Sequence, residues 1–427
     1  MGSVPGGCGH PPPEVVGSVP ERGGVNNRML LHCLCAIITH EMTRDIEVFL
    51  FVDALGWAFT ERYGFMTDVF PHRRGVDMQF GYSCSAIPTI LSGTRPAENG
   101  HLSLFRYDPK ASPFKFFSKF AWLFKPASFW NRGRVRNQLS KLVKKLYGFT
   151  GYFQLYRMPI EKLGLMDYCE KQDLFVKGGL GPVRNLADVA AEKGIVPGIS
   201  NWRNGDAAAF AQAKRDLADG KRFLFVYTAE FDALMHDEVT NKDDTRVRAK
   251  LSWYQAQIGE LLDALKATGR TYRLTLFSDH GMTPLTETAD LMHAVESTGL
   301  VFGEDYAACY DSTLLRVNYL KPSARETIEK ALAPFAEKGH WLSETEERAH
   351  GIWRADRAFG DAIFLMNPGI QIVPSDMGGK PLNGMHGFDP KDKWSQAAVL
   401  STEPIPEFVK SVGDYFRMMT ESMGGKA

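Results

Sequence analysis

Three long apolar runs, each with an aspartate at or shortly after its end, constrain the fold of this chain more than any other feature. Continuous runs of this kind are typical of strands buried on both faces of a parallel sheet. The runs cover residues 46–56, 222–229 and 272–281. Segments with helical periodicity that end in glycine separate them, at residues 181–194, 207–220 and 243–269. This alternation predicts an α/β fold, an α/β/α sandwich around a mostly parallel central sheet.

Two segments near the C-terminus predict further packing elements. Residues 310–317 have the apolar pattern of a strand, and we expect Asp311 to lie in a turn, with a supporting role near the site as the alternative. Residues 406–419 carry spaced apolar side chains that predict a helix packed on the core.

Length and composition agree with a large globular protein. The chain has 427 residues, of which 44% are hydrophobic and 23% are charged, so it can bury a full core. Its 50 basic and 50 acidic residues cancel, which argues against binding a nucleic acid polymer through bulk charge. No apolar window approaches the length of a membrane-spanning helix. The six cysteines have no metal-site or disulfide-framework spacing, so we expect free thiols in a reducing compartment.

The N-terminal residues differ from the rest of the chain. Residues 1–27 are rich in Gly, Pro and Val without periodicity, and residues 29–38 form a short apolar run. We predict that 1–41 is a leader, either disordered or a product of a misassigned start, and that the domain covers 42–427. A signal peptide or anchor at 29–38 is the alternative, although no small-residue cleavage site follows. We therefore expect a cytoplasmic protein and leave export open.

One segment interrupts the alternation of strands and helices. Residues 109–160 contain 11 Lys or Arg and 13 aromatic residues, with no Asp or Glu. We predict a basic, aromatic cap inserted over about residues 105–180. In one interpretation its aromatic side chains pack on the core while its basic groups reach water. In the other, residues 109–160 make a peripheral membrane contact, centred on 114–125, or grip a lipid-linked phosphate.

Carboxylates and imidazoles follow the predicted strands. In an open parallel sheet the loops after the strands face one crevice, so these side chains are expected to converge. Three Asp and three His would suit two divalent cations, most typically zinc. A hydroxyl close to both ions would lose its proton and attack phosphorus. The six side chains are Asp53, Asp232, His236, Asp279, His280 and His386.

The motifs around these residues resemble those of the alkaline phosphatase superfamily. They are FVDALG, GYSCSAIPTILSGTRPAENGH, EFDALMH, SDHGM and MHGFDP. The nearest branch is the type I phosphodiesterase/nucleotide pyrophosphatase group, and the resemblance covers roughly residues 46–105, 222–285 and 360–390. It implies an alkaline phosphatase-like catalytic domain that cleaves phosphoesters.

The resemblance also implies roles for single residues. Ser83, ten residues before Gly93, would be the nucleophile and form a covalent phospho-enzyme intermediate. Ser85 is the rival nucleophile, and a helix N-cap is the structural alternative for Ser83. Each implied zinc site has its own ligand set: Asp53, Asp279 and His280 with the Ser83 oxygen for one, and Asp232, His236 and His386 for the other.

Two positions depart from the patterns of the superfamily. Ile87 stands where sulfatases have an arginine, which argues against sulfate esters. Leu104 stands where nucleotide pyrophosphatases have an asparagine that contacts a phosphate oxygen. The candidates to replace that contact are Ser103, Arg106 and Tyr107. This departure concerns nucleotide recognition and leaves the metal chemistry intact.

These patterns predict a metal-dependent phosphoester hydrolase of the phosphodiesterase/pyrophosphatase type. Its partner would be a small phosphoester or a lipid-linked phosphate, with a diester or pyrophosphate favoured by the resemblance. A phosphotransferase that moves a phospho-headgroup to or from a lipid- or glycan-linked acceptor is the alternative. A catalytically silent scaffold would be expected to lose ligands, whereas Ser83 and all six Asp and His positions are present.

Overall fold

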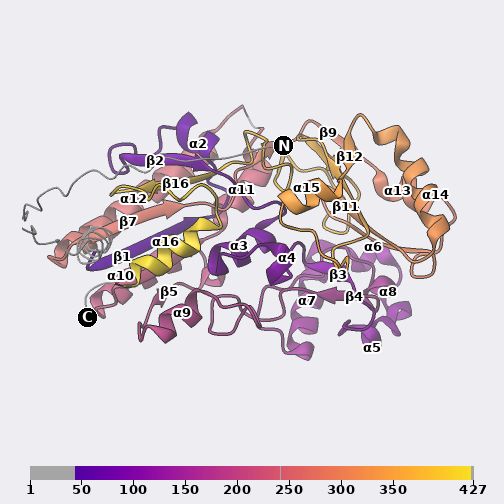
Figure 1. Ribbon diagram of the computed structural model, residues 1–427, viewed down its shortest axis with the longest axis horizontal. Coiled ribbons are helices and arrows are strands. Elements are labelled where there is room, and N and C mark those ends of the chain that lie inside the picture. Colours follow the sequence, from indigo (N-terminus) through magenta and orange to yellow (C-terminus); the bar gives the residue numbers. More distant parts are fainter. Residues whose placement is uncertain (1–43, 241, 425–427) are drawn as a thin grey trace, which may run out of the picture. The chain divides into compact units, whose positions relative to one another are not determined.

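A computed structural model of the chain describes residues 44–240 and 242–424 (Figure 1). The predicted leader, residues 1–41, lies outside the described residues, so its disorder and the signal or anchor alternative stay predictions. In the described part, no helix is both long enough and apolar enough to cross a membrane. The cysteines within it carry free thiols, at Cys84, Cys169 and Cys309.

A six-stranded sheet forms the centre of the fold, in the order β2-β16-β7-β1-β6-β5. Strand β1 pairs in parallel with both β6 and β7, and β5 pairs in parallel with β6, whereas β16 is antiparallel to its neighbours β2 and β7. The mostly parallel sheet expected from the sequence is therefore confirmed. The strands are β1 (Ile46–Val52), β2 (His72–Val76), β5 (Gly198–Ile199), β6 (Phe223–Thr228), β7 (Tyr272–Phe277) and β16 (Ala397–Ser401).

Helices cover both faces of this sheet, and its central strands β1, β6 and β7 are buried at almost every position. Val48 and Leu50 of β1 belong to a core cluster with α10, α11 and α12, whereas Phe49 and Phe51 belong to a second cluster with α3, α9 and α16. Burial on both faces makes β1 a continuous apolar run rather than an alternating one. The helices are α3 (Ser83–Ser92), α9 (Leu186–Glu192), α10 (Asp206–Ala218), α11 (Glu230–Glu238), α12 (Thr245–Ala267) and α16 (Asp414–Ser422).

A second, antiparallel sheet has the strand order β10-β11-β13-β12. The strand predicted over 310–317 is only partly right, because β10 ends at Tyr310 and β11 begins at Leu314. Asp311 lies in the turn between them, as expected, and its buried carboxylate accepts hydrogen bonds from Arg316 Nε (2.7 Å) and Ser103 Oγ (2.9 Å). These strands and the helices beside them are β10 (Tyr306–Tyr310), β11 (Leu314–Tyr319), β12 (Gly339–Trp341), β13 (Ala362–Met366), α13 (Leu291–Glu296) and α14 (Pro322–Leu332).

The segment predicted as a cap lies at the lower right of Figure 1, around α5, α7 and α8. Its strands β3 and β4 pair with each other and not with either larger sheet. It has a separate apolar cluster that includes Phe114, Leu139 and Tyr168. That this segment is an insertion, absent from related proteins, stays a prediction. Its elements are β3 (Phe105–Tyr107), α5 (Lys115–Ser118), the 3-10 helix η1 (Ala121–Phe124), α6 (Ala127–Trp130), α7 (Gly133–Tyr147), α8 (Ile160–Leu163) and β4 (Met166–Tyr168).

The C-terminal helix is shorter than the sequence predicts. It begins only at Asp414, and the expectation of a helix from residue 406 is wrong. The preceding backbone pairs with the end of β2 instead: Asp77 donates its N–H to the carbonyl of Lys410 and accepts from the N–H of Val412. Backbone groups used in this bridge are not free for helical hydrogen bonds.

The remaining elements are short connections around the two sheets. They are α2 (Trp57–Arg62), α4 (Pro96–Asn99), η2 (Trp202–Asn204), β8 (Thr283–Pro284), β9 (Glu287–Ala289), η3 (Ala333–Phe335), α15 (Glu344–Ala349), β14 (Ile370–Ile372) and β15 (Gly384–Met385). The antiparallel pairing of β15 with β8 matters most, because it brings the loop after residue 385 to the segment that follows β7.

Candidate metal centre and active site

Three adjacent parallel strands deliver side chains to one edge of the central sheet. Asp53 directly follows β1, and Asp279 and His280 follow β7 after one intervening serine. Asp232 lies in the first turn of α11, which begins two residues after β6. Because β7, β1 and β6 are neighbours, their carboxyl ends open onto the same place.

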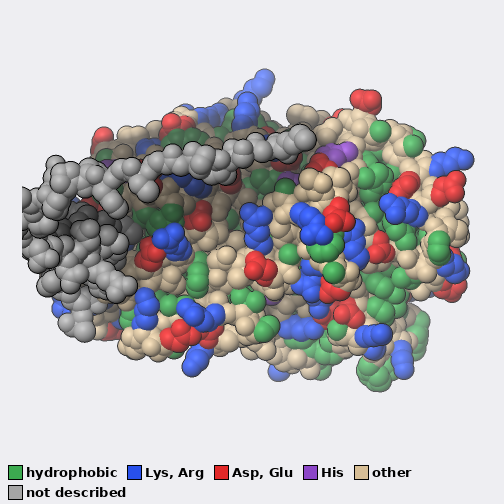
Figure 2. All heavy atoms as spheres, in the orientation of Figure 1, with side chains coloured by type: hydrophobic (Ala, Val, Ile, Leu, Met, Phe, Trp, Pro, Cys, Tyr) green, Lys and Arg blue, Asp and Glu red, His purple; other side chains and the backbone are tan. Residues whose placement is uncertain are grey.

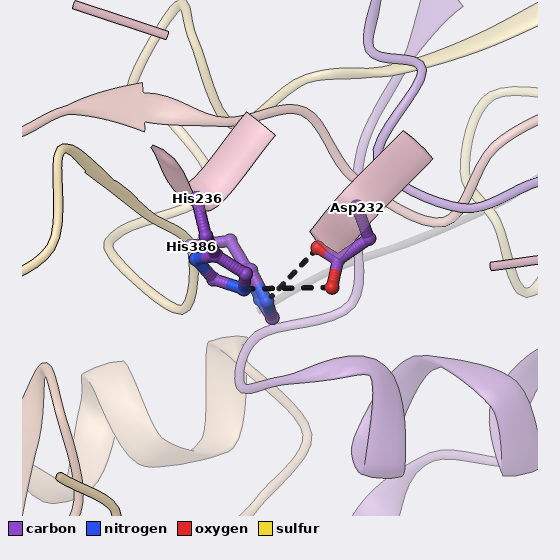
Figure 3. Close-up of side chains that lie close together, drawn as sticks. All are labelled: Asp232, His236 and His386. Atoms are coloured by element: carbon purple, nitrogen blue, oxygen red, sulfur yellow. Dashed lines mark ion pairs between the residues drawn. The ribbon is translucent and has the colours of Figure 1, made fainter. Parts of the chain in front are cut away.

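Asp232 faces two imidazoles at once (Figure 3). His236 is one helical turn further along α11, and its Nε2 lies 3.4 Å from Asp232 Oδ2. His386 directly follows β15, and its Nε2 lies 3.6 Å from Asp232 Oδ1. One ligand atom from each of these three residues fits within a mutual separation of 4.8 Å.

A second group adjoins the first and shares Asp232 with it. Ligand atoms of Asp53, Asp232 and His280 also lie within 4.8 Å of one another. Asp279 Oδ2 is 3.2 Å from His280 Nε2, and Asp53 Oδ1 is 3.6 Å from the same nitrogen. The six side chains expected to converge are thus brought together. The sequence-based grouping gave Asp232 to one ion only, whereas here its carboxylate belongs to both groups.

Backbone carbonyls orient two of the three imidazoles. His236 donates its Nδ1 proton to the carbonyl of Gly384, and His280 donates its own to the carbonyl of Gly281, each over 2.8 Å. This tautomer leaves the Nε2 lone pair of each ring facing the carboxylates, as in a metal ligand with an outer hydrogen-bond partner. His386 stacks on His280 with ring centroids 3.8 Å apart.

The buried oxygens of this cluster lack the hydrogen-bond donors that a buried carboxylate normally requires. Asp53 Oδ1, Asp232 Oδ1 and Asp279 Oδ2 accept no hydrogen bond within the described part of the chain. A buried anion without compensation is costly unless it is paired or coordinates a cation. Oxygen and imidazole ligands at these separations suit borderline divalent ions with bonds of about 2 Å. The residues present therefore fit divalent cations.

The pKa shifts of these side chains also indicate uncompensated negative charge. Burial, then the nearby Asp279 and Asp232, raise the pKa of Asp53 well above its usual range. Burial raises the pKa of Asp279 to about 7. Burial opposes the charged form of His236, yet Asp232 raises its pKa to about 9. The protein alone thus does not balance this concentration of negative charge.

Ser83 is the hydroxyl that enters the cluster. It is the first residue of α3, its Oγ lies 3.1 Å from His280 Nε2, and no side chain caps this helix, whose N-cap residue is Tyr82. The rival Ser85 is fully buried and donates its hydroxyl proton to the carbonyl of Phe80 over 2.8 Å. The N-terminus of α3 adds a partial positive charge beside Ser83.

Tyr227 is a site residue that the sequence analysis missed. Its hydroxyl donates to Asp53 Oδ2 over 2.5 Å, and its ring stacks on Phe51 of the neighbouring strand with centroids 4.4 Å apart. This contact fixes the orientation of the Asp53 carboxylate and leaves Oδ1 directed at His280. The available signal was a hydroxyl-bearing residue near the end of an otherwise apolar strand.

A cavity of about 790 Å³ opens over the cluster. Ser103 and Leu104 line it, whereas Arg106 and Tyr107 do not, and Arg106 is paired with Asp167 at 2.9 Å. Of the three candidates for the missing asparagine contact, only Ser103 therefore reaches the cavity. Polar and aromatic side chains from several segments complete the wall: Asn131, Tyr152, Tyr156, Arg157, Glu170, Phe175, Trp202 and Lys380.

Comparisons with known proteins agree with this geometry. Residues 81–389 match the family model described as type I phosphodiesterase / nucleotide pyrophosphatase. The human ectonucleotide pyrophosphatase/phosphodiesterase 5 superposes with a TM-score of 0.60 at 13% identity, covering 90% of this chain and 96% of that one. The murine protein gives 0.60 at 14% identity with the same coverage, also as an inactive variant in complex with AMP. These structures share the fold, and no curated protein is a significant match.

Proposed function

Because this chain belongs to the type I phosphodiesterase/nucleotide pyrophosphatase family and is a phosphoester hydrolase, we propose that it cleaves phosphodiesters or pyrophosphates through Ser83. The observation that carries the proposal is the position of the Ser83 hydroxyl, 3.1 Å from His280 Nε2 at the start of α3. The Asp and His side chains of the centre are potential metal ligands, so this hydroxyl is the nucleophile best placed to attack a bound phosphoryl group.

Two zinc ions are proposed as the cofactors, one at each of the two ligand groups. Bound there, they would lower the pKa of the serine hydroxyl and offset charge on the leaving oxygen. Tyr227 would hold Asp53 in its ligating orientation, and backbone carbonyls would hold His236 and His280. The N–H groups at the first turn of α3 would bind the non-bridging phosphoryl oxygens.

The reaction would proceed in two displacements at phosphorus. In the first, the Ser83 Oγ–P bond forms, the ester P–O bond breaks, and the leaving group departs with the bonding electron pair. In the second, water attacks the serine phosphodiester, the Oγ–P bond breaks, and a phosphate monoester leaves. The serine hydroxyl is regenerated, so one water is consumed per ester bond cleaved.

The cavity supports a diester with two sizeable substituents. Its volume of about 790 Å³ and its aromatic wall exceed what inorganic phosphate alone requires. A murine structural relative binds AMP, which supports a nucleotide product, although Leu104 replaces the asparagine of the nucleotide pyrophosphatases. The same volume would accept an acceptor alcohol in place of water, which keeps transfer to a lipid- or glycan-linked acceptor as the second candidate.

A metal and substrate survey of the purified full chain tests the proposal. Metal analysis should find about two zinc per chain. Hydrolysis of bis-p-nitrophenyl phosphate and of a nucleotide p-nitrophenyl ester should exceed that of p-nitrophenyl phosphate, vanish with chelator and return with zinc. Activity that persists after metal removal, or a preference for the monoester, would contradict it. Added glycerol tests for transfer, because a glycerol phosphodiester would form in place of the monoester.

A further inference from the structure

Exposed apolar side chains are concentrated in one stretch of the chain. Among the described residues, 11 large hydrophobic side chains are exposed, and 7 of them fall within 116–146. All the exposed aromatic side chains of the described part belong to this group, with Phe116 and Trp122 exposing 69% and 67% of their surface. Scattered exposed hydrophobic residues need no explanation, but a group of this kind marks an interaction surface. The seven are Phe116, Phe120, Trp122, Leu123, Phe129, Leu142 and Leu146.

The same stretch carries positive charge that the protein does not neutralise. None of the 11 Lys and Arg of residues 109–160 lies within salt-bridge distance of a carboxylate in the described part of the chain. The remainder of the chain has 50 acidic and 39 basic residues, so the segment is positive on a negative molecule. Lys115, Lys119 and Lys125 are exposed between the aromatic positions.

The exposed side chains stand on a packed aromatic base. Phe117 and Phe124 are only partly exposed and lie 5.1 Å apart, and Phe124 contacts Trp130 at 4.9 Å. Packing against the core therefore accounts for these rings and for the buried Phe114, but not for the outward-facing set. We define the docking patch as Phe116, Phe120, Trp122, Leu123 and Phe129 with Lys115, Lys119, Lys125 and Arg132. Figure 2 shows apolar and basic side chains side by side at the lower right, where this segment lies.

The docking patch adjoins the catalytic cavity. Asn131 and Gly133, which flank the patch residue Arg132, both line that cavity. Arg132 itself stacks its guanidinium over the ring of Phe129, with 5.3 Å to the centroid. A surface that engages the patch would therefore lie beside the cavity in which phosphoesters are cleaved.

We propose that the docking patch binds the surface of a bilayer that contains anionic lipid. Aromatic rings and Leu123 would enter the boundary between headgroups and acyl chains, and the lysines would contact lipid phosphates. A protein partner fits less well, because lysine is depleted at the centre of protein interfaces while here it alternates with the aromatic residues. Docking does not depend on the proposed function. Its consequence for catalysis does: the substrate would be a phosphodiester presented at the bilayer.

Vesicle co-sedimentation of the full chain tests the docking patch. Vesicles of phosphatidylcholine alone are compared with vesicles containing 30% phosphatidylglycerol, at 0.1 M and 0.5 M NaCl. We expect at least tenfold tighter binding to the anionic vesicles at low salt and a marked loss at high salt. Equal binding to both compositions, or no binding to either, would overturn the proposal.

Two variants assign the binding to the patch. The apolar variant carries Phe116→Ser, Trp122→Ser and Leu123→Ser, and the charge variant carries Lys115→Gln, Lys119→Gln and Lys125→Gln. Each variant should bind anionic vesicles about tenfold more weakly than the parent protein. The control Val196→Ser, Val301→Ser removes exposed apolar side chains elsewhere, and should leave binding unchanged. All variants keep residues 1–41, so any contribution of the leader cancels.

The charge variant protects the test against a folding defect. Its lysines are exposed, none forms an ion pair with a described carboxylate, and Lys115 makes only one surface hydrogen bond, to the carbonyl of Lys110. Its melting temperature and its hydrolysis of soluble bis-p-nitrophenyl phosphate should therefore match the parent protein. If that folded variant still binds anionic vesicles with parental affinity, the patch is only the outer face of a cap. If the charge variant binds anionic vesicles weakly, while neither the parent nor any variant hydrolyses the phosphodiester, the docking proposal is supported and the proposed function is contradicted.

Discussion

The catalytic centre and the segment 109–160 both concentrate charge of one sign, but in opposite surroundings. Asp53 and Asp279 are buried, and the removal of their carboxylates from water, together with the nearby carboxylates, raises the pKa of both. The lysines of the segment other than Lys144 are exposed, and dissolved ions screen their charge over a Debye length of about 10 Å at 0.1 M salt. The buried cluster therefore requires counter-ions in direct contact, whereas the exposed one needs only an oppositely charged surface nearby.

The largest expected effect concerns the catalytic centre and follows from removal of the Ser83 hydroxyl. Ser83→Ala should lower kcat for a phosphodiester by at least about 1000-fold, because the nucleophile is lost. Zinc content should stay near that of the parent, since the six Asp and His ligands remain. Initial rates with bis-p-nitrophenyl phosphate and metal analysis measure both quantities.

Ser85→Ala is the matched control for that variant. Its hydroxyl donates to the carbonyl of Phe80, so we expect a loss of about 1 kcal/mol of stability with activity within tenfold of the parent. An inactive Ser85→Ala beside an active Ser83→Ala would assign the nucleophile to Ser85.

The second prediction separates the two ligand groups. Asp232→Ala should reduce zinc from about two per chain to below one and lower kcat by at least about 100-fold, because its carboxylate belongs to both groups. His236→Ala removes a ligand from one group only and should retain about one zinc. Retention of both ions by Asp232→Ala would show that the groups do not share this carboxylate.

A third prediction concerns Glu170, which joins the two regions. It lines the cavity and accepts a hydrogen bond from the backbone N–H of Tyr152, and burial raises its pKa to about 8 from 4.5. The folded protein therefore holds this proton at pH values where the unfolded chain has released it. Its contribution to stability is complete below pH 4.5 and is lost as pH rises through about 8.

Glu170→Gln tests this predicted loss of stability with rising pH. Between pH 5 and pH 8 the parent should lose up to about 4 kcal/mol more unfolding free energy than the variant, since one pKa unit corresponds to about 1.4 kcal/mol. Urea unfolding of both proteins at the two pH values gives the difference directly. A parent that becomes more stable than the variant as pH rises would reverse the assignment.

The smallest effect is expected at Gly379, next to the basic side of the cavity. A Cβ at this position would fall 1.9 Å from Nη1 of Arg157, so Gly379→Ala must displace that guanidinium. If Arg157 contacts the substrate, KM should rise about threefold to tenfold with kcat unchanged. Gly378→Ala is the control, because nothing lies within 4 Å of its added Cβ. Equal KM values for both variants would exclude Arg157 from substrate binding.

The central sheet could be predicted because burial on both faces leaves an unmistakable apolar run in the sequence. The ends of β1, β6 and β7 then placed three carboxylates at one edge by the geometry of parallel strands alone. The second sheet was harder, since the strand and turn residues of 306–317 are all buried, and the polar turn residue Asp311 is held in the interior by Arg316.

The distances between side chains of the site could not be predicted from the sequence. That Asp232 belongs to both ligand groups depends on separations of a few ångströms between α11, β1 and the loop after β15. The Tyr227 contact depends on the lateral pairing of Tyr227 with Phe51, which no local pattern encodes. The start of α16 was misplaced because Asp77, more than 300 positions earlier, takes the backbone groups of residues 410–412.

The pairing of β15 with β8 has a consequence for the order in which the enzyme matures. The candidate ligands of the centre extend from residue 53 to residue 386, and His386 reaches the centre only when the strand before it has paired beside the segment that follows β7. A ribosome that synthesises the chain from its N-terminus releases Asp53 long before His386 exists. We therefore expect that nascent chains cannot bind their full complement of metal. The last ion would bind only after the whole chain has been synthesised and folded.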